Sequence, residues 1–179
     1  MSSVLYERYL KEIRPALRER RGYKNLLEVP RLKKVVISSG IGTSKERDVF
    51  DEALRTIGDI TGQKPVVTKA KKSIANFKLR QGQNVGAVVT LRGQRMYDFL
   101  FRLMNVALPR VRDFRGVSPK AFDGHGNYSL GVTDQSIFTE VNLDKMKHTI
   151  GFNVSIVSSA KTNEEGLELL TLLGMPFAK

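Results

Sequence analysis

The chain has 179 residues, 41% of them hydrophobic, which suits one compact domain spanning residues 1–179. Its 30 lysine and arginine residues exceed its 18 acidic residues, and the formal net charge is +12. That excess favours polyanions, because basic side chains neutralise phosphates and release counterions. There is no cysteine, which excludes disulfides and thiolate chemistry. Without an apolar run of about 20 residues or a signal peptide, a cytoplasmic protein with no membrane contact is expected.

The expected elements begin at the N-terminus with a helix. An apolar side chain recurs at every fourth position from Leu5 to Leu17, which predicts a helix over residues 3–20 that ends at Gly22. Pro15 is expected to kink this helix or to start a second one. The remaining elements are a strand over 31–38, a helix over 44–61, strands over 65–69 and 84–92, a helix over 94–108, a strand over 151–158 and a helix over 162–174.

Capping signals support two of these helices. Ser44 is a plausible N-cap for the helix over 44–61, and Glu46 and Asp48 suit the positive end of its dipole. Thr162 and Glu165 have the spacing of a capping box at the start of the last helix. In the helix over 94–108 the inward side chains are expected to be Met96, Phe99, Leu100, Leu103 and Ala107, with Pro109 as the stop.

The pattern predicts an α+β fold with a single antiparallel or mixed sheet, helices packed mainly on one face, and a long basic loop. Along residues 84–92 the side chains alternate in character. Ala87, Val89 and Leu91 fit a core, whereas Gly86, Val88, Thr90 and Arg92 point to the opposite face. Small and polar groups on that face would let an RNA backbone approach closely, although a solvent-exposed sheet face is an equally good interpretation of them alone.

Positive charge is concentrated in one part of the chain. Between Asp59 and Asp98 there is no acidic residue. The same stretch contains the basic residues Lys64, Lys69, Lys71, Lys72, Lys78, Arg80, Arg92 and Arg95. A run of charge is often only a solvated face, but solubility does not require a segment free of acids. The stretch is therefore predicted to face a polyanion.

Residues 68–83 are the most informative part of this stretch. They place their lysines and an arginine around Ser73, Asn76 and Phe77. Lysines offer mobile charges to phosphates, and an exposed Phe can stack on a base. The alternative is an ordinary hairpin loop in which Phe77 and Leu79 turn inward. The density of cations favours nucleic acid.

The stretch 109–131 is rich in glycine and arginine. A metal or phosphate site at residues 123–127 is disfavoured, because the segment lacks both the spaced carboxylates of a calcium loop and the ending of a phosphate loop. A tight turn that needs positive φ is the better interpretation. The only histidines, His125 and His148, lie in no catalytic or metal-binding pattern, so no enzyme, catalytic residue, metal or cofactor is expected.

Five strings occur in order along nearly the whole chain: VPRLKKVVISSGIG, ITGQKPVVTKAKKSIANFKLRQG, VTLRG, LPRVRDFRG and FDGHGNYSLG. Together they closely resemble the bacterial form of large-subunit ribosomal protein five, the 5S-rRNA-binding family. The resemblance implies a structural constituent of the large ribosomal subunit in its central protuberance, without a small-molecule substrate. Its implied partners are 5S rRNA, large-subunit rRNA, peptidyl-site tRNA and a small-subunit head protein.

The resemblance also implies three sets of contacts. 5S rRNA would be held by Lys33, Ser38, Gln63, Lys64, Thr90 and Arg92. Peptidyl-site tRNA would be met by a loop from Lys69 to Gly82, through Lys69, Lys71, Lys72, Ser73, Asn76, Phe77, Lys78 and Arg80. The bridge to the small subunit would use Arg110, Arg112 and Arg115, with 143–148 as a further candidate segment.

The chain departs from the family pattern at several positions. Ser38 stands where Asn is expected, which removes an amide donor, and His125 stands where Arg is usual. Thr139 and Leu143 replace what are often Pro and Tyr. Two other functions stay open: a general single-stranded RNA binder or RNA chaperone, and a nucleic-acid-processing enzyme. The chain has no Trp and the basic stretch holds one Phe, which makes a poor stacking platform, and no carboxylate or histidine cluster is apparent.

Overall fold

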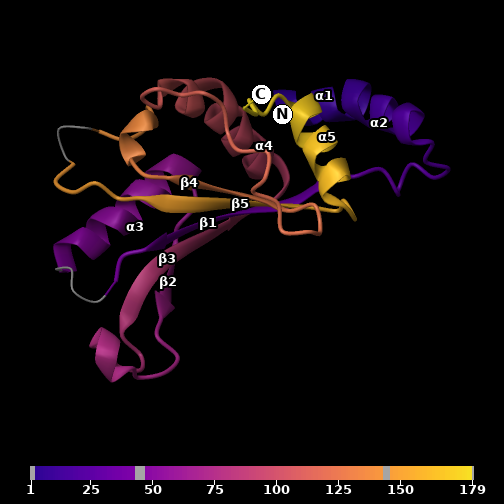
Figure 1. The fold of residues 1–179 in the computed structure, drawn as a ribbon. Coiled ribbons are helices and arrows are strands. Elements are labelled where there is room, and N and C mark those ends of the chain that lie inside the picture. Colours follow the sequence, from indigo (N-terminus) through magenta and orange to yellow (C-terminus); the bar gives the residue numbers. More distant parts are fainter. Residues whose placement is uncertain (1–2, 43–46, 143–145, 179) are drawn as a thin grey trace. The chain divides into compact units, whose positions relative to one another are not determined.

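The fold is built on one five-stranded sheet with the strand order β2-β3-β1-β5-β4 (Figure 1). It comes from a computed structural model, which describes residues 3–42, 47–142 and 146–178. The strands are β1 (Leu32–Gly40), β2 (Val66–Lys69), β3 (Asn84–Leu91), β4 (Tyr128–Val132) and β5 (Phe152–Ser158). The helices are α1 (Val4–Arg8), α2 (Arg14–Arg21), α3 (Arg47–Thr61), α4 (Gly93–Arg102) and α5 (Asn163–Leu173). The predicted α+β class is confirmed.

Internal contacts divide the chain into two compact units. The helical unit comprises Met1–Val35, Leu91–Leu130 and Ser155–Lys179. The loop unit comprises Val36–Thr90 and Gly131–Val154. The single domain expected from the length of the chain stays a prediction.

In the helical unit, the first predicted helix runs from Val4 to Arg21 but changes register in the middle. Its turn Tyr9–Ile13 is π-helical, and Pro15 lies in the first turn of α2. At that position the missing N–H group of proline destabilises the helix little. The irregularity expected at Pro15 takes the form of the π-helical turn before it. Gly22, with φ 66°, ends the helix as predicted. The predicted apolar stripe is buried: Leu5, Tyr9, Ile13 and Leu17.

The helix that starts at α4 agrees closely with the predicted range 94–108. The expected inward residues Met96, Phe99, Leu100, Leu103 and Ala107 are all buried. The chain continues from α4 through a π-helical turn, Leu103–Ala107, and Pro109 lies in the short 3-10 turn that follows, Leu108–Arg110. Proline is tolerated in the first turn of a helical segment, where an N–H has no intrahelical partner.

Two end signals in the helical unit act as expected. Thr162 accepts a hydrogen bond from the N–H of Glu165 at 3.3 Å, and Gly174 ends α5 with φ 101°. Glu165 reaches back to the N–H of Lys161 at 2.9 Å. Strand β4 was not predicted, because its sequence YSLGV lacks a β-branched run. Tyr128 anchors its start, since its ring is buried and its hydroxyl donates to the carbonyl oxygen of Ser118 at 2.7 Å.

In the loop unit, α3 packs through one apolar face. Ala53, Ile57 and Ile60 are buried, and Phe50 packs against a cluster that includes Ile41 and Ala53. Asp48 lies in the first turn of α3. The expected cap Ser44 and the neighbouring Glu46 lie outside the described residues.

A β-bulge interrupts the pairing of β2 with β3 at the base of the long loop. Thr68 pairs with Gly86, but the next residue, Lys69, pairs with Asn84, so Val85 is the extra residue. The carbonyl oxygen of Val85 accepts N–H groups from residues 41 and 42, at 3.0 and 3.2 Å. Bulges of this kind bend a strand and increase its twist. The bulge therefore helps to set the direction in which the long loop leaves the sheet.

Position 86, beside this bulge, has no space for a side chain. A Cβ atom at position 86 would overlap the main-chain oxygen of Ser39 and lie 3.1 Å from Oγ1 of Thr68. Its φ is not positive, so the constraint is the close approach of β1 and not the backbone conformation.

We expect Gly86→Ala to lower the free energy of unfolding by about 1–3 kcal/mol, because the added methyl group forces neighbouring main chain apart. Gly131→Ala is the matched control, since Gly131 is also a strand glycine without positive φ, and its added Cβ would meet only Oδ1 of Asn153 at 3.5 Å. Urea unfolding followed by circular dichroism should find the control within about 0.5 kcal/mol of the native chain. Equal effects of the two substitutions would contradict the steric argument.

Candidate nucleic-acid interface

The basic stretch between Asp59 and Asp98 carries exposed cations without acidic neighbours in the sequence. All eight of its lysines and arginines are exposed. Within residues 3–42, 47–142 and 146–178, none of the eight forms a salt bridge. By contrast, Arg20 and Arg21 both pair with Glu168, at 3.6 and 2.8 Å. The unpaired cations are thus available for phosphate groups.

The long loop between β2 and β3, residues 70–83, has its own hydrogen-bonded framework. Ile74 and Leu79 exchange two main-chain hydrogen bonds, at 2.9 and 3.1 Å, across a 3-10 turn, Ala75–Phe77. At its base, Ala70 donates to Gln83 at 2.8 Å and accepts from Gly82 at 2.9 Å. These bonds make the loop a hairpin whose side chains are displayed from a defined backbone.

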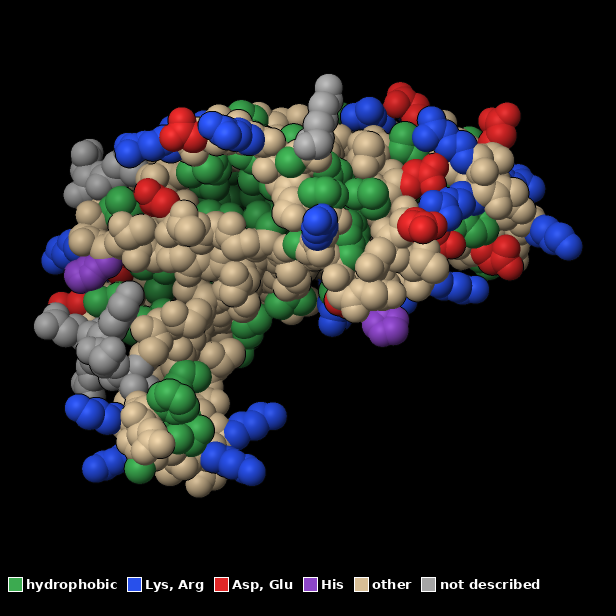
Figure 2. All heavy atoms as spheres, in the orientation of Figure 1, with side chains coloured by type: hydrophobic (Ala, Val, Ile, Leu, Met, Phe, Trp, Pro, Cys, Tyr) green, Lys and Arg blue, Asp and Glu red, His purple; other side chains and the backbone are tan. Residues whose placement is uncertain are grey.

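The tip of this loop combines cations with exposed apolar groups. Phe77 is 71% exposed, so the alternative in which it turns into the core is wrong for Phe77, while Leu79 is half-buried. Figure 2 shows basic side chains on both flanks of the tip, at the bottom of the view, with hydrophobic atoms between them. Lys69, Lys71, Lys72, Asn76, Lys78 and Arg80 are exposed as well. Ser73 is exposed, but its hydroxyl oxygen accepts the N–H of Gln81 at 2.9 Å.

The face of the sheet away from the core carries the predicted neutral contacts of the loop unit. In β1 and β3, Ser38 and Thr90 are half-buried, while their strand neighbours Ile37 and Val89 are buried. The amide of Gln63 donates to the carbonyl oxygen of Thr90 at 3.2 Å, which fixes Gln63 beside that strand. Lys64 follows it and is exposed. Ser38, Gln63, Lys64 and Thr90 therefore belong to one unit.

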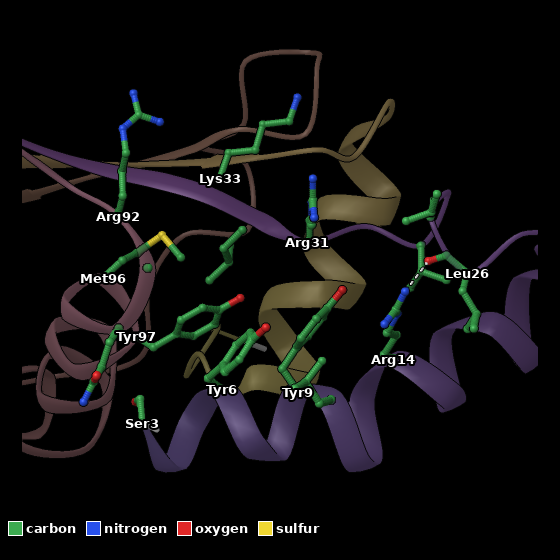
Figure 3. Close-up of a pocket in the computed structure, with 16 residues that line it drawn as sticks. Ser3, Tyr6, Tyr9, Arg14, Leu26, Arg31, Lys33, Arg92, Met96 and Tyr97 are labelled. Carbon is green, nitrogen blue, oxygen red and sulfur yellow. Dashed lines mark hydrogen bonds between the residues drawn. The ribbon is translucent and has the colours of Figure 1, made fainter. Parts of the chain in front are cut away.

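Lys33 and Arg92, the other two predicted 5S rRNA contacts, belong to the helical unit. Both are exposed and line a groove of about 720 Å³ together with Tyr6, Tyr9 and Arg31 (Figure 3). No motif in the sequence indicates this groove, because its lining comes from residues 3–14, 26–33 and 92–97, which lie far apart in the chain. The tyrosines are the only local signal, and Tyr9 alone belongs to a predicted helix stripe.

The predicted bridge residues lie on an exposed turn of the helical unit. Arg110, Arg112 and Arg115 are all exposed, and Asp113 between them adopts φ 54°. Of the second candidate segment, 143–148, residues 143–145 lie outside the described residues, and so does the Leu143 departure. Glu52 of α3 accepts the N–H groups of Lys147 and His148, at 2.8 and 3.3 Å.

The turn at residues 123–127 is structural, as the sequence favoured. The carboxylate of Asp123 accepts the N–H groups of His125 and Asn127, at 2.9 and 3.1 Å, and the side-chain amide of Asn127 at 2.7 Å. These hydrogen bonds, led by that of the Asn127 side chain, lower the pKa of Asp123 below its ordinary value of 3.8. The side chain of His125 itself is exposed.

Two further features are absent from the described residues. No group of three or more His, Asp or Glu side chains among them is placed to hold a metal ion. Within the same part of the chain, no helix has both the length and the apolar character needed to cross a membrane.

Comparison with known proteins identifies relatives along the whole chain. A family profile described as ribosomal protein L5 matches residues 25–80, and one described as the C-terminus of the ribosomal L5P family matches residues 84–177. The large ribosomal subunit protein uL5 of Caldanaerobacter subterraneus subsp. tengcongensis is 57% identical over 178 residues, covering 99% of each chain. The proteins of the same name from Natranaerobius thermophilus and Alkaliphilus oremlandii are 56% and 55% identical, covering 97–98% of this chain and 98% of each relative.

The geometry at Asp123 predicts a pH-dependent effect on stability. Since the pKa of Asp123 is lowered in the folded chain, its ionised carboxylate stabilises the fold above the ordinary pKa. That stabilisation is lost as the pH falls through the lowered value. We expect Asp123→Asn to lower the Tm at neutral pH, and the difference from the native chain to shrink as the pH falls below about 4. A Tm difference that stays constant down to about pH 3 would contradict this assignment.

Proposed function

The chain belongs to the ribosomal protein L5 family, whose members are structural, non-enzymatic constituents of the large ribosomal subunit, and we propose that it binds 5S rRNA in the central protuberance. Association with the ribosome and with rRNA follows from the family. The finer assignment is supported above all by one observation, the acid-free stretch between Asp59 and Asp98 with eight exposed cations that form no ion pair among the described residues.

Recognition of 5S rRNA is assigned to the sheet face that carries Ser38 and Thr90, with Gln63 and Lys64 beside it. Folded RNA is distinguished mainly by shape, 2′-hydroxyl groups and unpaired bases, which neutral donors and acceptors read at short range. Gln63 is held in place through its hydrogen bond to Thr90. Lys64 adds a phosphate contact that supplies affinity without sequence information. Lys33 and Arg92, which belong to the helical unit, are proposed as separate contacts of the same RNA.

The hairpin between β2 and β3 is proposed to contact peptidyl-site tRNA. It presents Lys71, Lys72, Lys78 and Arg80 around an exposed Phe77, a combination that suits a phosphate backbone and a sugar or base. The internal hydrogen bonds of the loop reduce the conformational freedom that would be lost on binding. Asn76, next to Phe77 at the tip of the hairpin, adds a neutral hydrogen-bond donor.

The exposed turn with Arg110, Arg112 and Arg115 is proposed to reach a protein of the small-subunit head. Arginine is suited to this role, because its planar guanidinium binds carboxylates through two hydrogen bonds. The described part of 143–148, in which Lys147 is exposed, remains a further candidate for the same contact.

Two substitutions at the proposed 5S rRNA contacts should separate affinity from selectivity. Lys64→Ala should weaken binding to 5S rRNA and to a shuffled RNA of equal length alike, and lower the slope of log K against log salt by about 1. Thr90→Val keeps the side-chain shape but removes the hydroxyl group. It should reduce the preference for 5S rRNA by about 3- to 10-fold and leave the salt slope unchanged. Fluorescence anisotropy over a salt series measures both quantities.

The native chain provides the decisive comparison in that series. A preference for 5S rRNA that persists at moderate salt supports a dedicated site. Equal affinity for both RNAs, falling together as salt rises, would mean that only nonspecific electrostatic binding is present, and it would favour a general RNA-binding protein or chaperone.

The loop is tested in assembled subunits. The double variant Lys71→Glu, Lys72→Glu reverses two exposed charges and should weaken peptidyl-site tRNA binding by about tenfold or more, because attraction to phosphate becomes repulsion. Lys71→Arg, Lys72→Arg preserves the charge and is expected to bind tRNA like the native chain. Filter binding of labelled tRNA to purified ribosomes gives the affinities. Unchanged tRNA affinity in ribosomes that contain the charge-reversed chain would sink the loop assignment.

A further inference from the structure

The arginine turn, residues 110–116 of the helical unit, is a largely exposed connection whose course depends on how its two ends are fixed. Near its start, the N–H of Val111 donates to the carbonyl oxygen of Leu108 at 3.1 Å. In its middle, Asp113 adopts φ 54°, in the left-handed region that residues other than glycine rarely adopt. A residue keeps such a conformation only while the surrounding chain holds it there. The way in which the far end of the turn is held therefore matters for the direction of its side chains.

The C-terminal segment, residues 176–178, holds the far end of the turn. The N–H of Val117 donates to the carbonyl oxygen of Pro176 at 2.8 Å, and the carbonyl oxygen of Val117 accepts the N–H of Ala178 at 2.9 Å. These two hydrogen bonds form a short parallel bridge between the two segments. The bridge fixes the main chain directly after the arginine turn.

Gly116 brings the two segments into direct contact beside Arg115. A Cβ atom at position 116 would lie 2.5 Å from the main-chain nitrogen of Ala178 and 2.8 Å from the carbonyl carbon of Phe177. Gly116 also has φ 97°, which glycine adopts without a steric penalty. No side chain therefore separates the end of the arginine turn from the C-terminal segment.

The ring of Phe177 anchors the C-terminal segment. Its centroid lies 5.5 Å from that of Tyr128, in an edge-on arrangement, and 6.4 Å from that of Phe122. Aromatic pairs of this geometry contribute more than the area they bury. Tyr128 is buried, and its hydroxyl donates to the carbonyl oxygen of Ser118 at 2.7 Å. Tyr128 thus contacts both the C-terminal segment and the chain that follows the turn.

The simplest alternative is that the C-terminal segment only stabilises the end of α5. That end has an anchor of its own, because Met175 is buried and its N–H donates to the carbonyl oxygen of Leu170 at 2.9 Å. The pairing with Val117 lies beyond this anchor. Its position favours a role for the segment at the arginine turn.

We propose that the C-terminal segment is a positioning element for Arg115, which it holds in place for a carboxylate of the small-subunit head protein. The proposal rests on the bridge proposed above and adds residues 176–178 to it. Arg115 is exposed and forms no salt bridge among the described residues, so its guanidinium is available. Binding through a loose turn loses conformational entropy, and a main chain already fixed beside Arg115 reduces that loss.

The test uses large subunits reconstituted with the native chain or a variant, and light scattering measures their affinity for purified small subunits. Phe177→Ala removes the anchoring ring and should weaken association by about 2- to 10-fold, the range expected for ordering one long side chain. Phe177→Tyr keeps the ring and should associate like the native chain. Ala178→Pro removes the N–H that Val117 accepts but leaves the ring of Phe177 in place, and it should also weaken association.

Arg115→Ala separates positioning from general stability. If the segment acts through Arg115, Phe177→Ala should have no further effect in a chain that already carries Arg115→Ala. NMR spectra of the isotope-labelled full chain should show shifted amide signals at residues 112–117 in Phe177→Ala, while the signals of residues 70–83 in the loop unit stay native. Ala178→Pro takes the place of Phe177→Ala in the same comparison if the Phe177→Ala chain does not assemble.

Two results would overturn the inference. One is an equal loss of association from Phe177→Ala in the native and the Arg115→Ala backgrounds, which is what a purely structural role predicts. The other is native association of either Phe177→Ala or Ala178→Pro while Arg115→Ala weakens it, and in that case the proposed bridge stands. Native association of Arg115→Ala itself would overturn the bridge role of Arg115, and this inference with it.

Discussion

The sheet buries one set of its alternating side chains, and every other property of the molecule depends on that constraint. In β3 the side chains of Ala87, Val89 and Leu91 go to the core. Because successive strand residues point to opposite faces, Val88 and Thr90 must then face outward. Within the loop unit, Ser38 and Thr90 therefore lie on the sheet face that does not carry the core.

Charged side chains differ in whether they find partners within the protein. The acids of α5 are used within the protein, where Glu168 pairs with Arg20 and Arg21, and Glu165 accepts the N–H of Lys161. Exposed salt bridges of this kind contribute little to stability, but they neutralise charge locally. The stretch between Asp59 and Asp98 has no acids of its own, and its cations form no such pairs among the described residues. This stretch therefore keeps its positive charge exposed.

Local signals predicted most elements, since the periodicity of apolar residues and the capping residues act over a few positions. The stripe from Leu5 to Leu17 and the cap at Thr162 are examples. Strand β4 was missed, because tertiary packing overrides weak local preference there. The positions of the candidate RNA contacts came from the resemblance to a family, and their roles stay predictions. The bulge at Val85 has no local signature, since it exists only in the pairing of two strands.

The groove marks the limit of reasoning from sequence in this chain. Tyr9 was predicted to belong to the apolar stripe from Leu5 to Leu17, whereas no role was predicted for Tyr6 or for Tyr97, which lies in another helix more than 80 residues away. Only folding brings these rings together, and the ring centroids of Tyr6 and Tyr97 are then 5.0 Å apart. Affinity for RNA can be inferred from charge alone, since phosphate contacts act at long range and without orientation. Selectivity cannot, because it requires neutral groups and rings held at fixed positions, and folding alone brings those positions together.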